Sequence, residues 1–329
     1  MLTAVLWYVS RHASDMGAAV NQLRSVRPST LGLAMVAMVG VMVANGAVHR
    51  RALGCVGVPI PEWRAARLAA ASHSINVVAP SAGLASFPLF MRAARQVERP
   101  AGAGIAGYLV ASLVGRAALV VTGLVVLPVF VHSSLGLLLP TAAVVAYAGI
   151  TAAKVSAAVA VSRRPESVER LMSRLRRSSA RSRPDGAPWF EESVAMPMRG
   201  LWTEPRALAP ALGWSLIGKA AGGVSVWIAV SAVGGTIPPG QAFAAFSLAT
   251  TAGALSFVPG GVGVVDAALA GCLGRFGLPL VTAAAATIVY RLFQLWVPLL
   301  LGALGATALN GTNARAIELA AALEPLPVG

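Results

Sequence analysis

Residues 256–270 read SFVPGGVGVVDAALA and lie within a long, almost uninterrupted apolar region. Pro259 lacks the backbone N–H that a continuous helix needs. The glycines that follow it, Gly260, Gly261 and Gly263, readily adopt non-helical backbone angles. Lipid cannot satisfy the polar groups of broken backbone, so such a break persists only where protein or a water-filled cavity receives them. The stretch therefore predicts an interrupted helix with a structural or functional reason for the interruption.

The segments on either side of the break are short. Residues 241–258 and 262–276 each fall below the length that crosses an apolar core of about 30 Å at a rise of about 1.5 Å per residue. We therefore predict a re-entrant hairpin whose tip, PGGVG, ends inside the bilayer. Asp266 lies in the first turn of the second arm, where a carboxylate can cap the backbone amides or pair with an arginine. We assign it, with Pro259, a structural role.

Composition places the chain in a membrane. Of 329 residues, 57% are hydrophobic and 12% are charged, and the mean hydropathy is +0.73. A soluble globular domain carries about 25% charged residues. Several stretches reach the roughly 18 apolar residues that indicate a membrane span. We predict an all-α polytopic membrane protein with six or more transmembrane helices.

Positive charge is concentrated in one segment. The net charge is +14, and ten arginines lie between Arg163 and Arg206. Such a run between hydrophobic segments indicates a cytoplasmic loop attracted to anionic lipid, not a nucleic-acid-binding surface. We predict a multi-pass protein of the plasma (inner) membrane with residues 163–206 in the cytoplasm and with no nucleic acid among its partners.

The chain divides into two membrane halves around this loop. The predicted parts are an N-terminal interfacial or partial helix (1–30), a first membrane half with a broken helix at 68–91 (31–162), the basic loop (163–206), a second membrane half with a re-entrant hairpin at 241–277 (207–310) and a C-terminal tail (311–329).

The two halves share a pattern. Pro80 and Gly83 interrupt an apolar run in the first half, as Pro259 does in the second, and an apolar span with one arginine follows each break: Arg116 in the first and Arg291 in the second. Interrupted segments at corresponding places are typical of transporters built from internal repeats. We therefore predict pseudo-repeated halves, and we assign Pro80 and Gly83 structural roles.

Charges at the bilayer centre cost at least about 2.5–3.5 kcal/mol each, so Asp266, Arg116 and Arg291 should face the interior. Asp266 either pairs with one arginine as a structural staple, or an arginine faces a cavity that receives an anionic head group. We hypothesise that Arg291 forms such a site with the amides of Gly260, Gly261 and Gly263. Further candidates for substrate binding are Arg116, Lys219, Tyr290, Asn76 and His73. Packing and satisfaction of broken backbone remain alternative roles for the last three.

Several of these residues belong to a familiar pattern. The runs SFVPGGVGVVD at 256–266, GLP at 277–279 and ATIVYRLFQLWVPLLLG at 286–302 resemble the lysylphosphatidylglycerol synthase transmembrane-region family. The Asn76, Pro80 and Gly83 segment fits the family's first half. Family members usually have Glu at the position of Asp266, and they carry an acid and an arginine where this chain has small or apolar residues around Ala85.

The resemblance implies a flippase-like membrane protein. In bifunctional members the membrane region moves a phospholipid that a separate cytosolic domain makes by aminoacyl transfer, and we expect the transport part alone here. The sequence contains no recognisable catalytic motif, metal-ligand spacing or nucleotide-binding loop, so we predict no enzyme activity, no cofactor and no metal. We predict a translocase of an anionic or polar-headed phospholipid or lipid-linked sugar, with motion that is downhill or ion-coupled. The alternative is a non-transporting partner that docks a lipid-modifying or glycosyltransferase enzyme through residues 163–206.

Overall fold

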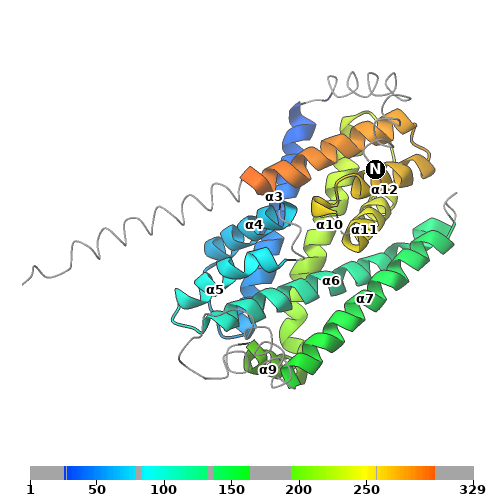
Figure 1. The fold of residues 1–329 in the computed structure, drawn as a ribbon. Helices are drawn as coiled ribbons and strands as arrows, with labels where there is room; N and C mark the ends of the chain where they lie inside the picture. Colours follow the sequence, from blue (N-terminus) through cyan, green and yellow to red (C-terminus); the bar gives the residue numbers. More distant parts are fainter. Residues whose placement is uncertain are drawn as a thin grey trace, which may run out of the picture.

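The computed structural model describes residues 26, 28–78, 83–131, 136–163, 194–256 and 258–300. Every regular element in these ranges is a helix, as the all-α prediction requires (Figure 1). Five helices in the described ranges are long and apolar enough to cross a membrane, where the sequence predicted six or more: Pro28–Cys55 (α3), Ala101–Val131 (α6), Leu138–Arg163 (α7), Pro205–Ala232 and Leu280–Leu300. The predictions for residues 1–25, for 164–193 of the basic loop and for the C-terminal tail lie outside the described residues.

Shorter helices connect and interrupt these spans. The span Pro205–Ala232 consists of a 3₁₀ turn followed by an α-helix. The remaining elements are α4 (Glu62–Val78), η1 (Leu84–Ser86), α5 (Phe87–Arg95), α9 (Met196–Thr203), η3 (Pro205–Leu208), α10 (Ala209–Ala232), α11 (Pro239–Leu255), η4 (Pro259–Gly261) and α12 (Val264–Arg275). The helix Leu280–Leu300 is called the last helix below. Both α4 and α11 have 17 residues, which gives each a length of about 25 Å, less than the apolar thickness of a bilayer.

The first half turns back on itself at its break. α3 leads into α4, which ends at Val78, and the next described elements are η1 from Leu84 and α5 from Phe87. α5 lies so close to the start of α6 that a Cβ on Gly104 would stand 2.0 Å from the Phe90 carbonyl oxygen. The segment predicted as a broken helix at 68–91 contains the end of α4 and the larger part of α5, two separate helices. α6 then carries the chain to the opposite end of the molecule, and α7 returns it (Figure 1).

The second half has the same order of helices. α10 leads into the 17-residue α11, the chain breaks at η4, and α12 packs back along α11 before the last helix begins. Phe276, at the end of α12, lies 5.5 Å (ring centroids) from Phe130, at the end of α6. α12 therefore ends at the end of the molecule opposite to α5.

Arginines gather at the end where α5 finishes. We call this the Arg-rich end: it holds the ends of α3, α5 and α7, the beginnings of α4 and α6, and the connection from α9 to α10. The Cys55 thiol contacts the Ala207 carbonyl oxygen (3.5 Å), and Arg199 Nε donates to the Ser162 carbonyl oxygen (2.6 Å). Its described arginines are Arg50, Arg51, Arg64, Arg67, Arg92, Arg95, Arg99, Arg163, Arg199 and Arg206.

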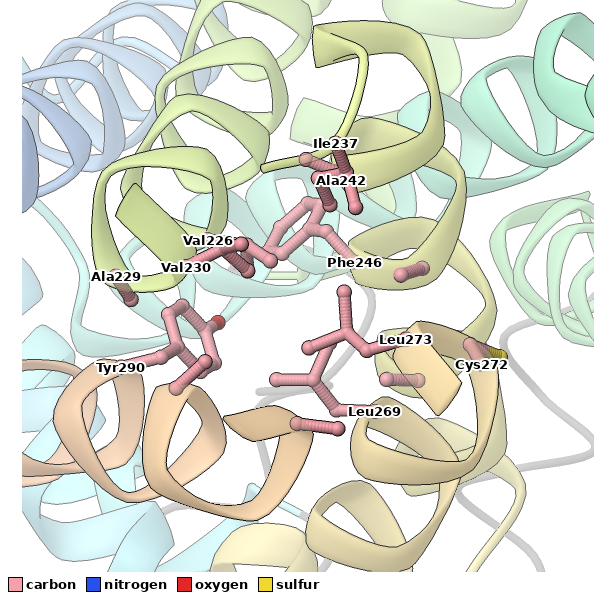
Figure 2. Close-up of a cluster of buried hydrophobic side chains, with 14 of the residues drawn as sticks. Val226, Ala229, Val230, Ile237, Ala242, Phe246, Leu269, Cys272, Leu273 and Tyr290 are labelled. Atoms are coloured by element: carbon pink, nitrogen blue, oxygen red, sulfur yellow. The ribbon is translucent and has the colours of Figure 1, made fainter. Parts of the chain in front are cut away.

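The apolar core forms two clusters. The larger joins α10, α11, α12 and the last helix, and Figure 2 shows the meeting of these elements around Val226, Phe246, Leu269 and Tyr290. The smaller joins α3, α4, α5 and α6 near the Arg-rich end. α3 and α10 pack along each other across the two halves. Small residues allow the close approach, since a Cβ on Gly218 would stand 3.3 Å from the Ala44 Cβ.

Candidate functional site

The break in the second half depends on its glycines. Gly260, Gly261 and Gly263 have φ values of +61°, +62° and +82°, which lie in the region that other residues avoid. The two arms also approach closely. A Cβ on Gly253 would stand 2.4 Å from the Val265 side chain, and one on Gly261 would stand 2.6 Å from it. The PGGVG sequence thus allows α11 to end and α12 to pack back against it.

Asp266 joins this break to the last helix. One carboxylate oxygen accepts the backbone N–H of Gly263, the residue before α12, at 2.7 Å. The other accepts Arg291 Nε at 2.9 Å. Asp266 therefore makes both contacts that the sequence analysis considered for it, the cap and the ion pair.

All three guanidinium nitrogens of Arg291 donate hydrogen bonds to other protein groups. The residue is 6% exposed. Besides Asp266, one terminal nitrogen donates to the Gly260 carbonyl oxygen at 3.1 Å, and the other donates to the Gln294 side-chain oxygen. The glycine amides are engaged as well, since Gly261 N donates to the Val258 carbonyl oxygen at 2.9 Å. The Arg291 guanidinium and the amides of Gly261 and Gly263, which the sequence analysis assigned to an anion, are thus bonded to other protein groups.

A polar network holds the break in the first half. Gly83 has a φ of +96°, and a Cβ there would stand 2.3 Å from the Tyr108 hydroxyl. Asn76 donates to that hydroxyl at 3.2 Å and accepts from the Ser86 hydroxyl at 3.2 Å. Asn76 therefore bridges the two sides of the break and α6. Pro80 lies outside the described residues.

The two breaks lie beside each other in the middle of the molecule. A Cβ on Gly260 would stand 3.4 Å from the Val77 side chain, in the last turn of α4. The Ser74 hydroxyl donates to the Pro298 carbonyl oxygen of the last helix at 2.9 Å. The interrupted segment of each half thus contacts the other half.

A cavity of about 280 Å³ lies between the halves, bordered by α3, α4, α10, α11 and the last helix. Met38, Met42, Gly222 and Phe246 supply part of an apolar wall. Its polar lining residues are Asn45, His73, Ser215, Lys219, Thr250, Tyr290 and Gln294. No carboxylate is among the described residues that line it.

Lys219 is the cation of this cavity. It lies midway along α10, and within the described residues it has no hydrogen-bond or ion-pair partner. His73 of α4 lines the same cavity and lies close enough to Lys219 for their charges to interact. Its Nε2 atom is buried and has no hydrogen-bond partner in the described part of the chain. Tyr290, 5% exposed, packs edge-on against Phe246 with ring centroids 6.3 Å apart.

The structure therefore separates the candidates of the sequence analysis into groups. Lys219, His73 and Tyr290 share the cavity. Arg291 lies beside it, connected through Gln294, which both lines the cavity and bonds to the guanidinium. The remaining candidates lie elsewhere.

Arg116 belongs to a different part of the molecule. Its guanidinium lies near the Tyr147 hydroxyl of α7 and near Lys154. It therefore contributes to the α6–α7 contact and does not line the cavity between the halves.

Sequence reasoning missed Asn45, Ser215 and Thr250 as lining residues. Each is a single small polar residue in an apolar helix, and small polar residues are common at ordinary helix contacts, so no sequence signal distinguished them. No group of three or more His, Cys, Asp or Glu residues within the described ranges could hold a metal ion.

Comparison with known proteins agrees with this architecture. Among curated proteins, no match to the chain was found. The family model described as the lysylphosphatidylglycerol synthase TM region matches residues 1–302. With its apolar helices and a match over most of its length, the chain is a multi-pass membrane protein that belongs to the lysylphosphatidylglycerol synthase transmembrane-region family.

Proposed function

We propose that the protein moves an anionic-headed lipid between the leaflets of the plasma membrane, and that the head group passes through the cavity between the two halves. The membrane architecture and the family support a lipid-related role. The cavity adds a place for a polar head group, and this is a feature that a protein acting only as a docking partner does not need.

The observation that carries the proposal is the unpaired ammonium of Lys219 in a cavity without a lining carboxylate. Lys219 is partly exposed on the cavity wall, and a charge in such a place within the bilayer favours a counter-ion or several hydrogen bonds. A phosphate would supply the counter-ion, and Asn45, Ser215 and Gln294 line the same space with hydrogen-bonding groups. We therefore assign the head-group contact to Lys219 in place of Arg291.

The size of the cavity fits part of a lipid. Its volume of about 280 Å³ is near the lower end of the roughly 300–1,000 Å³ range of ligand pockets. Such a space holds a phosphate and a small head group, whereas the acyl chains must stay in the bilayer. The proposal therefore has the head group move through protein while the chains remain in lipid.

The order and direction of the helices support an inverted repeat. In each half a long helix is followed by a 17-residue helix, a break, a short helix that packs back and another long helix. The first broken segment begins and ends at the Arg-rich end, and the second begins and ends at the opposite end. We propose that these segments are two re-entrant hairpins of opposite orientation. Transporters of this kind bind substrate at the interface of their repeats, where the cavity lies.

The Arg-rich end sets the proposed orientation. Ten of the described arginines lie there, and they include Arg50, Arg51, Arg64 and Arg67. An excess of Lys and Arg marks the cytoplasmic side of a membrane protein. We therefore place this end in the cytoplasm, where it would also attract anionic lipid.

Lys219→Gln in reconstituted vesicles tests the function. The variant should slow the transport of acyl-chain-labelled phosphatidylglycerol by about tenfold or more, because a hydrogen bond to a charged group contributes about 1.5–3 kcal/mol. Lys219 is partly exposed and has no ion-pair partner among the described residues, so its replacement should leave the fold intact and the purified variant monodisperse. Dithionite quenching of the outer leaflet measures the rate.

The matched control is Lys154→Gln. Lys154 is the chain's other lysine, lies exposed on α7 and does not line the cavity, so its replacement should leave the rate within about twofold of the parent. Equal rates for the two variants would remove Lys219 from the transport path. If the parent protein itself moves no lipid, the docking alternative takes the place of transport.

A further inference from the structure

Two side chains that can carry a positive charge line the cavity. The proposed function assigns a head-group contact to one of them, Lys219, and none to the other, His73. Lys219 of α10 supplies the ammonium, and His73 faces the same space from α4. The buried Nε2 atom of His73 has no hydrogen-bond partner among the described residues. Buried polar atoms are nearly always paired, so this atom requires an explanation.

We propose that the cavity takes up a proton together with the anionic head group, with His73 as the proton acceptor. This inference rests on the proposed function and extends it by naming the coupled ion. The proton binds His73, and a phosphate between His73 and Lys219 then accepts hydrogen bonds from both. The only covalent bond that changes is the N–H bond that the proton forms with the His73 ring.

The electrostatics of the cavity explain the coupling. Two positive charges in a space of low dielectric repel each other strongly, so His73 stays neutral while Lys219 is charged and the cavity holds no anion. An anion that enters compensates both charges and so favours protonation of His73. By linkage, the proton must strengthen binding of the anion by the same factor.

The other titratable groups around the cavity do not replace His73. From the last helix, Tyr290 lines the cavity. A phenol is neutral near neutral pH and never carries a positive charge. Arg291 and Asp266 neutralise each other beside it. On α3, the His49 ring bonds to the Asn45 carbonyl oxygen at 2.8 Å and does not line the cavity. The lining residues of α11 are uncharged.

The test measures binding of short-chain phosphatidylglycerol to the full-length protein in detergent from pH 5.5 to pH 8.5. Affinity should fall by roughly fivefold or more over this range, at the lower end of typical coupling factors. In His73→Gln the affinity should equal the weak value of the parent at high pH and should not change with pH. His49 is a part-buried histidine outside the cavity, so His49→Gln should keep the pH dependence of the parent.

A second measurement uses the unchanged protein, so it does not depend on the folding of a variant. Short-chain phosphatidylglycerol added to a weakly buffered sample near pH 7 should cause uptake of protons, up to about one for each lipid bound. Phosphatidylcholine, whose head group is neutral overall, should cause none.

The outcomes separate the two proposals. Transport and binding without pH dependence or proton uptake would overturn the coupling and leave lipid transport intact. Persistence of the pH dependence in His73→Gln would also overturn it. Absence of both binding and transport in the parent would instead overturn the proposed function on which the coupling rests.

Discussion

Asp266→Asn should lower the free energy of unfolding by more than is usual for a substitution beside a loop. The change keeps the size of the side chain and one acceptor oxygen, but it removes the negative charge opposite Arg291. The Asp266 oxygens accept Arg291 Nε at 2.9 Å and Gly263 N at 2.7 Å. Because Arg291 is 6% exposed, its charge would remain buried without a counter-ion.

The size of the effect follows from this burial. Breaking a buried ion pair by removing one partner costs about 3–5 kcal/mol. The Asp266 side chain is 35% exposed, so solvent screens part of the interaction and the lower end, about 3 kcal/mol, applies. A protein of this size loses about 2–4 °C in Tm for each kcal/mol, which gives a decrease of about 6–12 °C.

Exposure of a buried thiol provides the assay. Cys272 lies in the larger core cluster and is 4% exposed, so a thiol-reactive dye reaches it only when the second half unfolds. Cys55, the other cysteine, is replaced by serine in every sample. Fluorescence is followed while the detergent-solubilised protein is heated.

The control is the exposed pair between Arg50 and Glu62. Its atoms lie 2.8 Å apart, but the side chains are 38% and 80% exposed. Such pairs contribute about 0–1 kcal/mol, so Glu62→Gln should shift Tm by at most about 4 °C. A decrease in Tm for Asp266→Asn no larger than that for Glu62→Gln would refute the stabilising role of the Asp266–Arg291 ion pair.

Two further predictions concern packing and orientation. Gly104→Ala should lower Tm by several degrees, because its Cβ would stand 2.0 Å from the backbone oxygen of Phe90, whereas Gly115→Ala on the same helix meets nothing within 4 Å; equal Tm values would contradict the close contact. With no native cysteine present, Thr236→Cys should react with an impermeant thiol reagent on intact cells and Glu98→Cys, at the Arg-rich end, should not; the reverse pattern would invert the proposed orientation.

The sequence predicted the interruptions well because their cause is local. A proline without an N–H and glycines with positive φ end a helix whatever surrounds them. The arms predicted at 241–258 and 262–276 correspond to α11, Pro239–Leu255, and α12, Val264–Arg275. The all-α membrane class and the family followed from composition and from the same motif, and both are confirmed.

The partners of the buried charges could not be predicted in the same way. The spans are apolar on all sides, so periodicity does not tell which face of a helix meets protein and which meets lipid. Asp266 pairs with Arg291 and not with Arg116 because the last helix packs against α12. The meeting of His73 with Lys219 depends on how α4 packs against α10, and neither residue carries a sequence signal for the other.

The bond between Asp266 and Arg291 also sets an order of assembly. Arg291 follows Asp266 by 25 residues, so the carboxylate leaves the ribosome well before its cation does. α11 and α12 are each too short to stand across a bilayer as separate inserted helices, and a charged residue alone resists partition into lipid. We therefore expect both arms to insert stably only after the last helix has been made. A nascent chain stalled before Arg291 should accordingly be degraded, because the carboxylate of Asp266 has no cation to bind.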